Sequence, residues 1–135
     1  MPERSWWWLW IQCPGIGSVR MRQLCSAAAE TPQGLEDLWS WPLSRLEKAF
    51  KWPASLLCSF ERYRGAVGSH PVMEVPGHVL LPCDPEWPAG FDSLERPPLS
   101  LQWCGHRELL SLLSSQQAVA VVGTRRPSPP ALRMA

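Results

Sequence analysis

Proline placement constrains the fold of this chain more than any other feature, because proline interrupts helices and sheet ladders alike. Fifteen of the 135 residues are proline, and they crowd between residues 71 and 98 and again after residue 126. Regular elements in those two regions must therefore be short. Between residue 4 and about residue 69, in contrast, the apolar residues keep helical spacing, which predicts a small helical bundle.

Within this bundle, one helix is expected to start at Thr31-Pro32, and Pro42 and Pro53 are expected to break the helices that precede them. Gly65 and Gly68 close the last helix, which begins near residue 54. The many tryptophans are expected to pack in the core, because the cationic face of a helix lying on a membrane is missing. The residues that mark the predicted buried faces are Trp7, Trp8, Ile11, Val19, Leu24, Cys25, Leu35, Leu38, Trp39, Leu43, Leu46, Ala49, Phe50, Leu56, Leu57, Phe60 and Tyr63.

Beyond His70 the pattern changes to short extended pieces, at residues 79–81, 99–104 and 118–122, with short helices predicted at 88–94 and 107–115. We therefore expect a helical domain over residues 1–70 and an α/β domain over residues 71–135, with a boundary near residues 68 to 76.

A strand and a turn near the end of the chain carry the clearest functional signal. Residues 118–122 are five small or β-branched apolar residues, typical of a parallel strand covered on both faces. At its carboxyl end Gly123 allows close backbone approach, Thr124 offers a hydroxyl, and Arg125 and Arg126 offer charged forks for phosphate oxygens, while Ser128 is a candidate helix N-cap. The pattern predicts a phosphate site, with solvated arginines after an ordinary core strand as the alternative.

A second candidate phosphate contact is the turn Pro-Gly-Ile-Gly at residues 14–17, which lies between two helical stretches. Gly15 and Gly17 allow a tight bend whose backbone N–H groups can face a phosphate, and Arg20 and Arg22 follow on the outgoing helix. Met21 stands where a helix-hairpin-helix motif usually has a small residue. A purely structural turn is therefore the equal alternative.

Bulk composition excludes several classes of protein. The net charge of +1 rules out nucleic-acid binding by overall charge, so any such binding rests on local clusters. Five widely spaced cysteines without a CxxC pair indicate free thiols in a reducing compartment, hence the cytoplasm, and no metal site is assigned, although His106 lies near Cys104. No apolar run is long enough for a membrane helix, and we expect a soluble protein.

Taken in order, several short motifs resemble the DprA/Smf family of DNA-processing proteins. The resemblance begins with Trp-Trp-Leu-Trp at residues 7–10, leading into the Gly-Ile-Gly turn. It continues with Asp-Pro-Glu-Trp-Pro at 84–88, which is similar to the family's Asp-x-x-Tyr-Pro, and with Arg-Pro-Pro-Leu-Ser-Leu at 96–101. It ends with Cys-Gly at 104–105, Leu-Leu at 109–110 and the Val-Gly-Thr-Arg step at 122–125, which is similar to the family's Val-Gly-Ser/Thr-Arg. Trp87 in place of tyrosine and Pro-Ala at 130–131 depart from the family's pattern.

The resemblance implies a helix-hairpin-helix or SAM-like helical domain followed by the start of a Rossmann-like parallel α/β domain. It implies a competence protein that binds single-stranded DNA and loads the RecA recombinase during natural transformation, and it allows a homodimer in longer relatives. Gly123, Thr124 and Arg125 match the family's DNA-phosphate contacts. Because later Rossmann elements are missing, we expect an amino-terminal portion with impaired activity, which needs no cofactor and is not an enzyme.

Two other classes of function remain open. In a nucleotide-binding Rossmann-type enzyme fragment, a downstream acid would serve as a base, but the acids Asp84, Glu86, Asp92 and Glu95 lack a histidine partner and are expected to be solvated surface groups. In a protein-interaction module, the Trp-rich helical domain would offer exposed tryptophans as a docking face.

Overall fold

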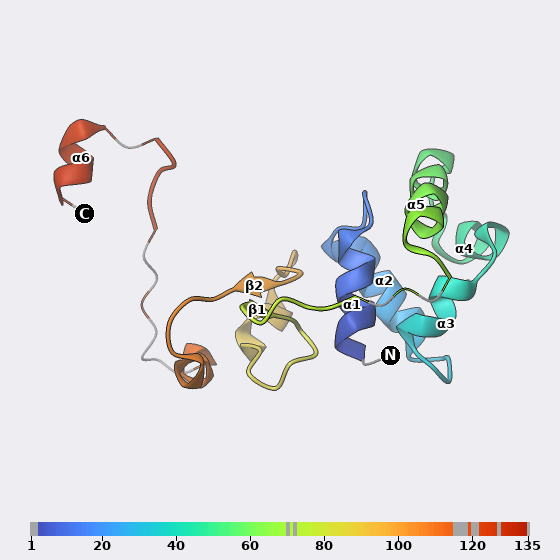
Figure 1. Ribbon diagram of the computed structural model, residues 1–135, viewed down its shortest axis with the longest axis horizontal. Coiled ribbons are helices and arrows are strands. Elements are labelled where there is room, and N and C mark those ends of the chain that lie inside the picture. The colour runs from blue at the N-terminus through green and yellow to red at the C-terminus, as the bar shows by residue number, and fades with distance from the viewer. Residues whose placement is uncertain are drawn as a thin grey trace.

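Residues 3–69, 71, 73–114, 119, 122–126 and 128–134 are described by the computed structural model of the protein. Five helices make up its amino-terminal half: α1 (Glu3–Gln12), α2 (Ser18–Ala28), α3 (Leu35–Ser40), α4 (Leu43–Phe50) and α5 (Ala54–Val67). They form the bundle on the right of Figure 1. The predicted helical region is confirmed.

The helix boundaries follow from local chemistry. Pro42 and Pro53, both in extended backbone, occupy the N-caps of α4 and α5, so the predicted proline breaks are confirmed. The predicted helix start at Thr31-Pro32 is wrong. The Thr31 hydroxyl oxygen lies within hydrogen-bond distance of the Ala28 carbonyl (2.9 Å) and the Gly34 carbonyl (3.0 Å). Residues 31–34 therefore form a turn, and α3 begins after Gly34, whose φ is 63°.

Aromatic side chains fill the centre of the bundle. The Trp10 ring stacks on Phe60 with centroids 5.1 Å apart, and it meets Trp39 edge-on at 5.3 Å. The Trp10 indole N–H donates to the Leu35 carbonyl at 3.1 Å. All nine tryptophans are buried or half-buried, and six of them lie in or against the core of the bundle, so core packing is confirmed for most of them and an exposed tryptophan docking face is not observed.

The buried faces of α1 and α2 differ from those predicted. In α1 the buried residues are Trp6, Leu9 and Trp10, whereas Trp7 and Trp8 are half-buried. In α2 the buried residues are Met21, Leu24 and Ala28, whereas Val19 is 56% exposed. Large apolar residues occur on several faces of these helices, so helical spacing alone does not show which face is buried. Contact with α3 and α5 selects the buried face.

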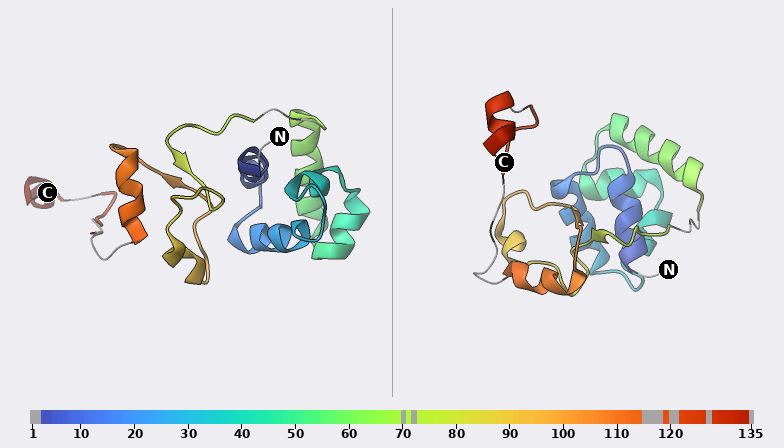
Figure 2. Two further views of the ribbon diagram at one scale, coloured as in Figure 1. Left: turned by 90° about the horizontal axis from the view of Figure 1, so that it is seen from below. Right: turned by 60° about the vertical axis from the view of Figure 1, so that its left-hand side comes forward.

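The second half of the chain is composed of short elements. Strands β1 (Val79–Leu80) and β2 (Leu101–Gln102) pair antiparallel, with Val79 opposite Gln102. The 3-10 helices η1 (Ala89–Ser93) and η2 (Arg107–Ser114) lie within the two predicted short helices, and α6 spans Pro129–Met134. Figures 1 and 2 show the small sheet beside α1, with η2 and α6 farther from the bundle. The parallel Rossmann-like sheet stays a prediction.

The predicted buried strand at 118–122 falls largely on residues 118, 120 and 121, which lie outside the described residues. Val119 and Val122 are described, have no regular structure, and are 87% and 91% exposed. Burial of these two valines is therefore a wrong expectation, because no described element packs over them.

Candidate nucleic-acid interface

The turn at residues 14–17 lies between α1 and α2, as the sequence indicated. The Ile16 amide donates to the Cys13 carbonyl at 3.1 Å, and Gly17 is the N-cap of α2 in extended backbone. No side chain caps this end of α2, and its first intrahelical bond runs from the Met21 amide to the Gly17 carbonyl at 2.8 Å. The two helices and their Gly-Ile-Gly turn are thus observed, and contact with DNA stays a prediction.

The two glycines of this turn are not equivalent. Gly15 has φ of +88°, and a Cβ atom added there would lie 2.7 Å from Cδ1 of Leu56 on α5. A Cβ on Gly17 would meet no atom within 4 Å. Gly15 is therefore required by the fold, whereas Gly17 leaves open space around the start of α2.

Replacing Gly15 with alanine is expected to lower the free energy of unfolding by about 1–2 kcal/mol, because alanine is strained at this φ and crowds Leu56. Gly17→Ala is expected to cost less, about 0.5 kcal/mol. Urea unfolding followed by tryptophan fluorescence measures both variants. Equal costs at the two positions would contradict the structural distinction.

The two arginines that follow the turn have separate tasks. The Arg20 guanidinium donates from Nη1 to the Gly15 carbonyl at 2.6 Å, so it holds the turn. The exposed Arg22 donates from Nη2 to the Glu95 carbonyl at 3.0 Å, in the loop before β2. Because a guanidinium carries five N–H donors, both groups keep donors for a phosphate.

The described residues of the predicted phosphate turn at 123–126 and 128 all lie at the surface. Gly123, Thr124, Arg125, Arg126 and Ser128 are all exposed, and a Cβ on Gly123 would meet no atom within 4 Å. The Arg126 amide donates to the Thr124 hydroxyl at 3.2 Å. In the described part of the chain neither arginine forms an ion pair with a carboxylate, so both guanidinium charges face solvent.

These two candidate contacts do not form one site in this structure. The hairpin lies in the bundle, whereas the views in Figures 1 and 2 place the segment that precedes α6 away from it. The hairpin and the turn before α6 are therefore two separate candidate contacts for an anion.

Asp84 has a role that the sequence did not reveal. Its carboxylate is buried, with Oδ1 2.7 Å from Nε of Arg4 on α1 and Oδ2 accepting the Leu81 amide at 2.8 Å. Arg4 also donates to the Val79 carbonyl. The expectation of a solvated surface acid is wrong for Asp84, because α1, 80 residues away, supplies its partner. We name this Arg4–Asp84 contact the latch.

Other acids of the same group differ from Asp84. Glu86 is half-buried and pairs with Arg107 at 3.2 Å, whereas Glu95 is exposed. The side chain of Asp92 is outside the described set.

A second contact reinforces the latch, since the Trp7 indole N–H on α1 donates to the Leu99 carbonyl at 3.0 Å. The motifs at 84–88 and 96–101 thus attach the small sheet to the bundle.

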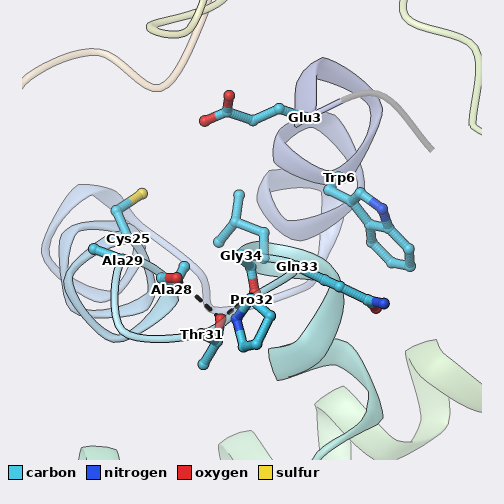
Figure 3. Close-up of a pocket in the computed structure, with 10 residues that line it drawn as sticks. Glu3, Trp6, Cys25, Ala28, Ala29, Thr31, Pro32, Gln33 and Gly34 are labelled. Atoms are coloured by element: carbon cyan, nitrogen blue, oxygen red, sulfur yellow. Dashed lines mark hydrogen bonds between the residues drawn. The ribbon is translucent and has the colours of Figure 1, made fainter.

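A hollow of about 480 Å³ lies between α1 and the turn that joins α2 to α3 (Figure 3). Its ionisable groups are the Glu3 carboxylate and the Cys25 thiol. Burial, followed by the nearby charges of Glu3 and Cys83, raises the pKa of Cys25 to about 11. The thiol is therefore protonated at neutral pH, and the pair is not an activated nucleophile with its base.

Metal-binding chemistry has no support among the described residues, where no three His, Cys, Asp or Glu side chains come together as a ligand set. Nδ1 of His106 instead lies 3.2 Å from Oε1 of Glu108, and all five cysteines carry free thiols. None of the helices that the structure describes is long and apolar enough to cross a membrane.

Comparison with known proteins finds one similarity, in the second half of the chain. Residues 78–135 match the family model described as DNA recombination-mediator protein A. The matched range begins just before β1 and includes both the latch carboxylate and the phosphate turn. No curated protein and no solved structure matches the chain.

Proposed function

We propose that this chain, whose residues 78–135 match the family model described as DNA recombination-mediator protein A, binds single-stranded DNA and mediates recombination. The observation that carries the proposal is the exposed cationic turn inside the matched range. Arg125 and Arg126 present two adjacent guanidinium groups to solvent, with the Thr124 hydroxyl beside them. Planar guanidinium groups suit the paired oxygens of a phosphate.

Thr124 and Ser128 add hydroxyl groups on either side of the two arginines, and Gly123 leaves room for the ligand to approach the backbone. Contacts of this kind hold a phosphate backbone without reading base identity. The proposed ligand is therefore single-stranded DNA of any sequence, bound through its phosphates.

The wider role follows from the family. We propose that the protein works with the RecA recombinase in DNA uptake and transformation, in the cytoplasm, as a binding protein rather than an enzyme and without a cofactor. The Cys25 thiol in the hollow beside α1 is protonated at neutral pH, so it offers no ready nucleophile there.

Titration of a fluorescent oligo-dT with the whole chain, at several salt concentrations, tests the proposal. We expect saturable binding at low salt, and the variant Arg125→Ala/Arg126→Ala should bind at least tenfold more weakly. Each lost phosphate contact should reduce the slope of log K against log salt by about 0.7, so the double variant should lose about 1.4.

The matched control is Arg133→Ala, which removes an exposed charge a few residues away on α6. It should bind as the unmodified chain does. No binding of the unmodified chain at low salt, or equal weakening by the control, would refute the role of the turn.

A further inference from the structure

A basic groove lies on the bundle, beside the start of α2 and apart from the phosphate turn. It is a depression of about 500 Å³ lined by Arg20 of α2, Lys51 and Phe50 at the end of α4, and Arg96 from the loop before β2. A neighbouring depression of about 510 Å³ extends along α2 and shares Val19 and Phe50 with it. We call the two together the α2–α4 groove.

The charge of this groove has a single sign. Arg20, Lys51 and Arg96 line its first depression and Arg22 lines its second, and none of the described lining residues is acidic. The Lys51 and Arg96 side chains are exposed, and no described carboxylate pairs with either. Four cations from three parts of the chain converge although the net charge of the chain is only +1. Such a concentration attracts an anion carrying several charges.

The backbone conformation at Lys51 supports a functional role for the charge of its ammonium group. Its φ of 54° is left-handed, and it is the one non-glycine residue with positive φ in the described part of the chain. Glycine is the usual residue at such a helix end, and lysine is strained there. A lysine in this conformation places an ammonium group at the groove at a cost in stability.

Apolar side chains also line the groove. Val19 is 56% exposed, and the half-buried ring of Phe50 lines both depressions. A ligand that suits both cations and apolar side chains has a charged backbone and flat apolar units, which describes single-stranded DNA better than an acidic peptide.

We infer that the α2–α4 groove is a second contact for single-stranded DNA, with Arg20, Lys51 and Arg96 on phosphates and Val19 against a base or sugar. The inference rests on the proposed function and extends it to a surface on the bundle, where Val19, Arg20 and Lys51 lie outside the matched range and Arg96 lies within it. Neither Lys51 nor Arg96 belongs to the hairpin motif.

The variant Lys51→Gly gives a sharp test, because its two effects have opposite signs. Glycine relieves the left-handed strain, so Tm should rise by about 3 °C. Affinity for labelled oligo-dT at low salt should fall about fivefold, and the salt slope should fall by about 0.7. Lost binding in a stabilised protein cannot be attributed to unfolding.

Three further variants of the whole chain complete the experiment. Arg96→Ala should repeat the loss of affinity and of slope, and Val19→Ser should weaken binding about threefold without changing the slope. Lys48→Ala removes an equal charge from α4 outside the groove, and it should leave binding unchanged.

The outcomes separate this inference from the proposed function. If the unmodified chain binds oligo-dT but Lys51→Gly and Arg96→Ala bind as well as Lys48→Ala does, the groove is not a contact and the turn at 123–126 acts alone. A second outcome is that poly-glutamate of matched charge displaces oligo-dT from the groove while Val19→Ser binds oligo-dT as tightly as the unmodified chain does. In that case an acidic peptide is the better occupant, and the inference is overturned. If the unmodified chain does not bind, the proposed function falls and the inference falls with it.

Discussion

Replacing Trp10 with alanine is expected to lower the free energy of unfolding by about 3–5 kcal/mol, the cost of truncating a fully buried tryptophan. Trp10 has no exposed surface, and its ring contacts Phe60, Trp39 and Trp52 at centroid distances of 5.1, 5.3 and 6.5 Å. The variant also leaves the Leu35 carbonyl without the indole N–H that now lies 3.1 Å away. An effect of this size is comparable with the whole stability of many small domains.

Urea unfolding followed by far-UV circular dichroism measures this cost. The matched control is Trp8→Ala on the same helix, since Trp8 is half-buried and is not among the residues packed against the core. The control is expected to cost about 1 kcal/mol or less. Similar losses for the two variants would contradict the observed orientation of α1.

Breaking the latch should produce the second large effect. In Arg4→Met the buried Asp84 carboxylate loses its cationic partner, and we expect a loss of about 2 kcal/mol. This value is smaller than for a fully buried pair because the Arg4 side chain is 32% exposed, against 7% for Asp84. The Leu81 amide, which donates to the same carboxylate, should exchange faster with solvent as the small sheet detaches from α1.

A double-mutant cycle isolates the contribution of the pair. Asp84→Asn keeps an oxygen acceptor for the Leu81 amide but removes the charge, so Arg4→Met/Asp84→Asn should be more stable than Arg4→Met alone. Amide hydrogen exchange and urea unfolding provide the two measurements. Additive losses, with no recovery in the double variant, would show that the latch does not couple α1 to the sheet.

Local features of the sequence predicted the helices well. Pro42 and Pro53 mark the starts of α4 and α5. Proline lacks a backbone N–H group, so it interrupts a helix whatever the tertiary structure around it. The family's motifs were also evident in the sequence, and residues 78–135 match the model of that family. The start of α3 was mispredicted because side-chain bonds of Thr31 compete with helix formation within a single turn.

The candidate site was predicted only in part. The sequence indicated the hairpin glycines and the arginine pair at 125–126, and the structure shows those arginines exposed. It did not indicate Lys51, which no motif includes, and it gave no sign that Arg96 lies near Arg20, because that proximity depends on how the bundle and the loop before β2 pack. The positive φ of Lys51 has no sequence signal either, since glycine is the residue that marks such positions.

The sequence by itself determined where the helices break, which residues carry the family's motifs and which turn offers groups suited to a phosphate, because each depends on neighbours along the chain. The tertiary structure decided which face of α1 is buried, that Asp84 is a buried partner of Arg4, and that cations from α2, α4 and the loop before β2 share one groove. Those properties depend on contacts between residues up to 80 positions apart, whose formation is governed by the packing of the whole bundle.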